Sequence, residues 1–120
     1  LRLQDEIDAL IREHEPQAVA IEGIFHAKNV KTMLILSHAR GAIIAQCARR
    51  GIPVYEYAPR RVKMAVSGNG AAQKEQVQKM VKTLLHLDGE PQNDAADALA
   101  LAITHLHSRS ALQALSSEPV

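Results

Sequence analysis

The chain has 120 residues, enough for one hydrophobic core and too few for two. Hydrophobic residues make up 47% and charged residues 22%, which excludes a disordered chain, and no apolar run approaches the roughly 18 residues of a membrane helix. The net charge of +1 is uneven, because residues 49–82 sum to +6 whereas residues 1–48 sum to −1 and residues 83–120 to −4. A basic middle between acidic segments suits a protein that holds phosphates and cations, although a solvated helix face gives the same pattern.

The first half of the chain alternates predicted helices and strands. The apolar spacing predicts a helix from Leu3 to Glu15, where the following proline ends it. Residues 18–24 are apolar except for Glu22, which predicts a strand covered on both faces, as in a parallel sheet. After a loop at residues 25–30, a long helix is predicted at residues 31–50, with Cys47 as a buried small hydrophobe.

The second half begins with a predicted strand at residues 53–57, so the order of elements indicates an α/β domain with a parallel crossover. Helices are predicted at residues 60–66 and 74–87, and Asn93 is expected to cap a final helix that ends at His107. The predicted buried face of that helix holds Ala95, Leu99, Ala102, Ile103 and Leu106. We expect one domain over residues 1–107 and a polar, frayed tail over residues 108–120.

Three acidic residues are candidates for chemistry. Glu22 is predicted to be an ionised carboxylate in an apolar strand, which costs several kcal/mol unless it is paired or binds a metal; a strand-end Glu that reaches solvent is the ordinary alternative. Asp94 and Asp97 share one face at the start of a helix, where the helix dipole alone would account for them. If they faced Glu22, the three carboxylates would form an oxygen-rich site suited to Mg²⁺.

Four blocks of sequence, taken together, resemble the RuvC-type Holliday junction resolvases in order and spacing. They are Ala-Ile-Glu-Gly-Ile-Phe-His-Ala-Lys-Asn at residues 20–29, Ala-Arg-Gly at 39–41, Tyr-Glu-Tyr-Ala-Pro at 55–59 with Val62-Lys63, and Asn-Asp-Ala-Ala-Asp-Ala-Leu-Ala at 93–100. The resemblance implies an RNase H-like fold, with a mixed sheet flanked by helices, and metal-dependent cleavage of four-way DNA junctions in recombination and repair. It also implies a homodimer, with the helix that contains Gly41 as the candidate contact, and work with the branch-migration proteins RuvA and RuvB.

The resemblance assigns a role to each matching residue. Glu22, Asp94 and Asp97 match carboxylates that bind two Mg²⁺ ions, for which Mn²⁺ can substitute, and Lys63 and Lys74 match catalytic lysines near the scissile phosphate. Phe25 matches a phenylalanine placed to stack on an unpaired base at the crossover. We further expect contacts to the DNA backbone, without sequence readout, from Lys28, Lys31, Arg60 and Arg61.

The sequence departs from the family pattern at one point, and two other functions stay open. The family carries a further catalytic Asp, followed by Pro-Gly, on its first strand; the first three strands have no counterpart here, so we expect these 120 residues to be inactive alone. A RuvC-related nuclease that processes ribosomal RNA would share the acids, but its loop after the strand Glu differs. A module that binds junctions or dimerises without catalysis would bind DNA equally well with and without Mg²⁺.

We expect a cytoplasmic protein, since residues 1–6 lack the layout of a signal peptide.

Overall fold

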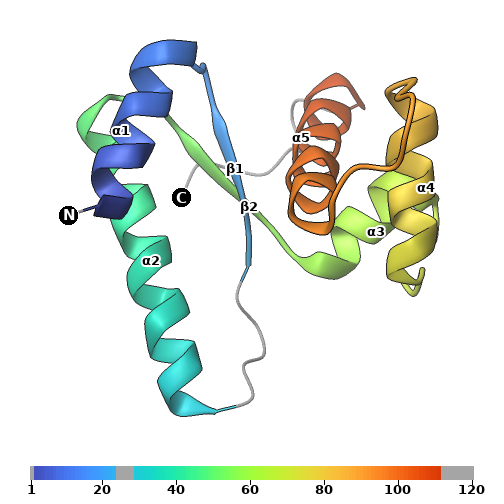
Figure 1. Ribbon diagram of the computed structural model, residues 1–120, viewed down its shortest axis with the longest axis horizontal. Coiled ribbons are helices and arrows are strands. Elements are labelled where there is room, and N and C mark those ends of the chain that lie inside the picture. Colours follow the sequence, from blue (N-terminus) through green and yellow to red (C-terminus); the bar gives the residue numbers. More distant parts are fainter. Residues whose placement is uncertain (1, 24–28, 112–120) are drawn as a thin grey trace. The chain divides into compact units, whose positions relative to one another are not determined.

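The structure, a computed structural model, describes residues 2–23 and 29–111. Its elements, in chain order, are α1 (Arg2–His14), β1 (Val19–Glu22), α2 (Val30–Arg49), β2 (Val54–Tyr57), α3 (Pro59–Ser67), α4 (Lys74–Leu84) and α5 (Asn93–Ala111) (Figure 1). This order confirms the predicted α/β class. The described residues fall into two compact units: the N-terminal unit ends at Glu56 and the C-terminal unit begins at Tyr57. No helix among these residues has the length and apolarity needed to cross a membrane.

The two strands pair as the sequence predicts. The backbone N–H of Val19, at the start of β1, donates to the carbonyl of Pro53, just before β2, at 3.0 Å. Since this bond joins the beginnings of both strands, they run parallel, and α2 forms the crossover between them. β1 is shorter than the strand predicted at residues 18–24, of which residue 24 lies outside the described residues.

The core of the N-terminal unit lies on one face of this sheet. Ile11 of α1, Cys47 of α2 and Val54 of β2 form a buried cluster, and the partly buried hydrophobic residues packed against it are Ile7, Val19, Ile21, Ile43, Ile44 and Ile52. The predicted burial of Cys47 is confirmed, and the same burial raises the pKa of its thiol.

Within the N-terminal unit, helices α1 and α2 cover one face of β1, and Val19, Ala20 and Ile21 are half-buried, so the predicted cover of both faces stays a prediction. Val19 and Ile21 contact the helix-covered face, and because side chains alternate along a strand, Ala20 and Glu22 point to the opposite face. Glu22 is exposed, which matches the ordinary alternative of a Glu at a strand end that reaches solvent. Burial therefore gives no reason for this carboxylate to bind a metal.

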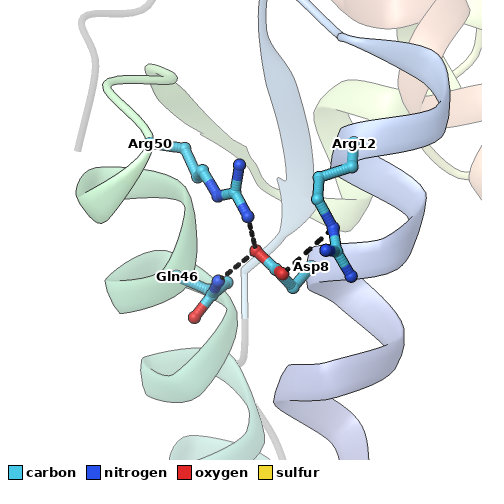
Figure 2. Close-up of polar contacts among 4 residues, drawn as sticks. All are labelled: Asp8, Arg12, Gln46 and Arg50. Carbon is cyan, nitrogen blue, oxygen red and sulfur yellow. Dashed lines mark hydrogen bonds and ion pairs between the residues drawn. The ribbon is translucent and has the colours of Figure 1, made fainter.

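A polar network holds α1 against α2 (Figure 2). The side chain of Gln46 donates to Oδ1 of Asp8 at 2.7 Å, Arg50 donates to the same oxygen, and Nε of Arg12 lies 3.3 Å from Oδ2. Partial desolvation acts to raise the pKa of Asp8, but the hydrogen bonds from Arg50 and Gln46 and the nearby arginine charges outweigh it and lower that pKa. These contacts fix how the two helices lie on the sheet.

Helix α2 is capped at its N-terminus and tied to β2 near its middle. Its N-cap is Asn29, whose side chain accepts the N–H of Thr32 at 2.8 Å, and Arg40 forms an ion pair with Glu56 of β2. A Cβ atom built on Gly41 would meet nothing within 4 Å among the described residues. The first half of α2 carries exposed hydrophobic residues, namely Val30, Met33, Leu34, Ile35 and Leu36.

The core of the C-terminal unit contains a buried hydrogen bond between Tyr57 and His105, whose Oη and Nδ1 atoms lie 2.6 Å apart. The buried hydrophobic residues of this unit are Tyr57, Val62, Val66, Ala72, Val81, Ala96, Ala100 and Ile103. The predicted buried face of α5 was correct at Ile103 but wrong at Ala95, Ala102 and Leu106, which are exposed. The small side chains of Ala96 and Ala100 form the packed face instead, because they allow α3 and α4 to approach closely.

The ends of α4 and α5 differ from the prediction. Helix α4 ends at Leu84, where His86 and Leu87 donate to the carbonyls of Thr83 and Lys82 at 3.3 and 3.0 Å in a Schellman motif. Asn93 lies inside α5 and its side chain accepts a hydrogen bond from Gln78, so it does not act as the predicted cap. Helix α5 continues to Ala111, beyond the predicted end at His107.

Candidate functional site

The two aspartates of α5 lie on its exposed side. Asp94 is in the first turn and Asp97 is three residues further, whereas Ala96 and Ala100 face the core. The carboxylate of Asp97 lies 3.5 Å from Nζ of Lys74, and these side chains are 48% and 52% exposed. This end of α5 therefore presents solvent-accessible oxygen ligands beside a cation.

Helix α4 sets the position of this acidic turn. Lys74 pairs with Asp97, and Gln78, one turn further along α4, donates to Asn93. Because the higher residue number on α4 meets the lower number on α5, the two helices run antiparallel. The structure thus brings together two of the residues that the sequence selected, Lys74 and Asp97, through contacts that the sequence alone did not indicate.

Glu22 belongs to the N-terminal unit, as the last residue of β1 on the sheet face turned away from α1 and α2. Within the described residues of either unit, no three His, Cys, Asp or Glu side chains gather into a group that could hold a metal ion. The donor chemistry nevertheless suits a hard divalent cation, since all three candidate ligands are carboxylates exposed to solvent.

The predicted basic residues differ in their surroundings. Arg61 lies with its guanidinium carbon 5.0 Å from the centre of the Tyr57 ring and donates to Ser108 at 3.0 Å, so it also stabilises the C-terminal unit. Arg60 packs on Gly70, where an added Cβ atom would lie 3.0 Å from Cγ of the arginine. Lys63 of α3 is half-buried.

The remaining predicted DNA contacts lie in or before the first turn of α2. Lys31 is exposed there. Phe25 and Lys28 lie outside the described residues, so their predicted roles stay predictions.

A second basic feature was not predicted from the sequence. An open hollow of about 500 Å³ at the C-terminal end of α4 is lined by Lys79, Lys82, Thr83, His86, Leu87 and Glu90. Its signal in the sequence is the spacing of Lys79, Lys82 and His86 by three and four residues, which places them along one side of a helix and its end. In the charge pattern these lysines stand out only as members of the basic middle of the chain.

Comparison with known proteins connects this geometry to one family. The family model described as "Crossover junction endodeoxyribonuclease RuvC" matches residues 1–105. Proteins of that name from Halorhodospira halophila and Chromohalobacter salexigens are 52% and 53% identical over 92% and 86% of this chain. The chain spans 66% and 55% of the lengths of these two relatives.

Solved structures show the same likeness. The structure of Thermus thermophilus RuvC in complex with a Holliday junction substrate is similar over 99% of this chain and 71% of its own, with a TM-score of 0.89 and 33% identity. Another structure of Thermus thermophilus RuvC gives a TM-score of 0.85 over 99% of this chain and 70% of its own. These similarities confirm the predicted RNase H-like fold.

Proposed function

The chain belongs to the RuvC family of crossover junction endodeoxyribonucleases, and from this premise we propose that the protein resolves four-way DNA junctions by metal-dependent phosphodiester hydrolysis. The observation that carries the proposal is the exposed acidic turn of α5, where Asp97 lies beside Lys74. A relative at 33% identity and the same fold has been solved with a Holliday junction substrate. The first source of support is local geometry, and the second is family membership, which gives that geometry its role.

We assign three carboxylates to metal binding. Glu22, Asp94 and Asp97 would hold divalent cations, Mg²⁺ in the first place with Mn²⁺ as a substitute. When bound, two such ions supply a hydroxide from water and stabilise the leaving oxygen of an in-line displacement. The residues of this chain supply oxygen ligands on the exposed end of α5 and at the end of β1.

We assign Lys74 and Lys63 to contacts with the scissile phosphate. Lys74, half exposed and already beside Asp97, would neutralise a non-bridging oxygen of the scissile phosphate, and Lys63 would act beside it. Arg60, Arg61, Lys31 and Lys28 would contact the DNA backbone, which positions the substrate without reading its sequence, and Phe25 would stack on an unpaired base. In Arg61 the contacts to Tyr57 and Ser108 hold the guanidinium in place and so reduce the entropy lost on binding DNA.

We also propose that the protein acts as a homodimer, because a four-way junction has twofold symmetry and must be cut symmetrically. The exposed hydrophobic residues in the first half of α2 and the open surface at Gly41 support this helix as the contact. Changing Ile35, which is 59% exposed, to Asp should convert the dimer to monomers in sedimentation velocity experiments. An unchanged sedimentation coefficient would contradict α2 as the interface.

Cooperation with RuvA and RuvB, and a cytoplasmic location beside the chromosome, complete the proposal.

The decisive experiment uses the full-length protein and a synthetic four-way junction. Asp94→Asn and Glu22→Gln should abolish cleavage in the presence of Mg²⁺ while leaving junction binding intact, because each removes a metal ligand and keeps the shape of the side chain. A non-catalytic module predicts no cleavage by the unmodified protein and equal binding with and without Mg²⁺. An RNA-processing nuclease predicts that single-stranded RNA is cut in preference to branched DNA. Either result would overturn the proposal.

A further inference from the structure

The hollow at the C-terminal end of α4 combines fixed positive charge with hydrogen-bond donors. Lys79 is exposed and Lys82 is half-buried, and neither forms an ion pair with a carboxylate among the residues that the structure describes. Glu90 on the rim contributes one negative charge against these two positive charges. The hydroxyl of Thr83 donates to the carbonyl of Lys79 at 3.0 Å, so the lysines and His86 remain as the donors available to a ligand.

The ordinary explanation for lysines at this position is the helix dipole, which favours cations near a helix C-terminus. His86 follows the end of α4 and lines the same hollow. His86 occupies the left-handed conformation, with φ of 55°, at the position of the Schellman motif that glycine usually fills. Helices α2 and α3 end on Gly51 and Gly68 in that conformation, with φ of 70° and 79°. This conformation ends α4 at His86 and leaves its imidazole among the residues that line the hollow.

The Schellman motif also removes an obstacle to binding an anion. Free carbonyl groups at a helix C-terminus repel negative charge, but here the carbonyls of Lys82 and Thr83 accept hydrogen bonds from Leu87 and His86. The lysine ammonium groups therefore face the ligand without competition from these carbonyls.

We propose that Lys79, Lys82 and His86 bind a phosphodiester in a duplex arm of the DNA substrate, as a contact additional to those at the acidic turn. This inference rests on the proposed function. Lys82 follows Lys74 by eight residues on α4, which corresponds to about 12 Å along the helix at 1.5 Å per residue. That distance spans about three to four base-pair steps of duplex DNA. One rigid helix thus links the residue beside Asp97 to a contact on the arm.

The test measures binding of the full-length protein, without Mg²⁺, to a fluorescent four-way junction and to a linear duplex over a range of salt concentrations. Lys79→Gln/Lys82→Gln should raise Kd on the order of tenfold for both DNAs, and the slope of log K against log salt should fall by roughly one for each phosphate that the variant no longer neutralises. Arg2→Gln, which removes one exposed positive charge outside the hollow, should leave both quantities unchanged.

A second pair of variants separates binding from folding. His86→Gly should raise Tm, because glycine relieves the left-handed conformation, and yet weaken DNA binding. Glu15→Gly is the matched control: Glu15 has φ of 46° after α1, so its replacement should raise Tm with no change in Kd. If the double lysine variant binds junctions as tightly as the unmodified protein, the inference is wrong. If the unmodified protein binds no junction at all, the proposed function fails as well.

Discussion

Replacing Asp97 by asparagine should separate stability from catalysis. The Asp97–Lys74 ion pair has an N–O distance of 3.5 Å, and about half of each side chain is exposed. Ion pairs of this kind contribute about 0.2–1 kcal/mol, so the free energy of unfolding should fall by less than about 1 kcal/mol. Loss of a carboxylate ligand to a catalytic metal removes several kcal/mol of transition-state stabilisation, which corresponds to a cleavage rate at least about a hundredfold lower.

Two assays on the same preparation of the full-length protein check this separation. Urea denaturation followed by circular dichroism gives the free energy of unfolding, and single-turnover cleavage of a four-way junction with Mg²⁺ gives the rate. Glu75→Gln is the matched control, since it makes the same chemical change at an exposed position in the first turn of α4. It should leave the cleavage rate unaltered. A stability loss above about 2 kcal/mol for Asp97→Asn, or cleavage within about threefold of the unmodified protein, would refute the reasoning.

Two further predictions concern the stability of each unit. The folded-state pKa of Asp8 is lowered, so its carboxylate stabilises the fold above its ordinary pKa of 3.8 and this contribution is lost as the pH falls below that value through the folded-state pKa. Asp8→Asn should therefore flatten the acid limb of a plot of Tm against pH, and an unaltered limb would show that its contacts to Gln46 and Arg50 contribute nothing. Tyr57→Phe removes the buried hydroxyl that bonds to His105 and should lower the free energy of unfolding by about 1–3 kcal/mol in urea denaturation, whereas a change below about 0.5 kcal/mol would contradict the role of this bond.

The element order was predictable from the sequence because amphipathic spacing and chain punctuation are local. Pro16 and Gly51 mark ends of helices, and the apolar run around Ile21 marks a strand. It was harder to predict which face of each helix or strand is buried. The buried face of α5 was misjudged because side-chain size favoured Leu106, whereas close helix packing selects small residues such as Ala100. Whether Glu22 is exposed could not be decided from the sequence, because it depends on which face of the sheet α1 and α2 cover.

The candidate site shows the same division between local and long-range information. Asp94 and Asp97 could be selected from the sequence because their shared face is set by helix geometry alone. The contact of Lys74 with Asp97 depends on how α4 packs against α5, which no local pattern encodes. The roles of these residues came from the family resemblance, since acids at a helix start are common for reasons unrelated to catalysis.

Because Cys47 is buried, the reactivity of its thiol reports how often the structure around it opens. It is the only cysteine in the 120 residues, its side chain is 1% exposed, and burial raises the pKa of its thiol. A thiol reagent can therefore react only when the packing of α1, α2 and β2 around it opens. The labelling rate then measures the opening equilibrium of the N-terminal unit alone, without an introduced probe and without a signal from the unit that carries Asp94 and Asp97.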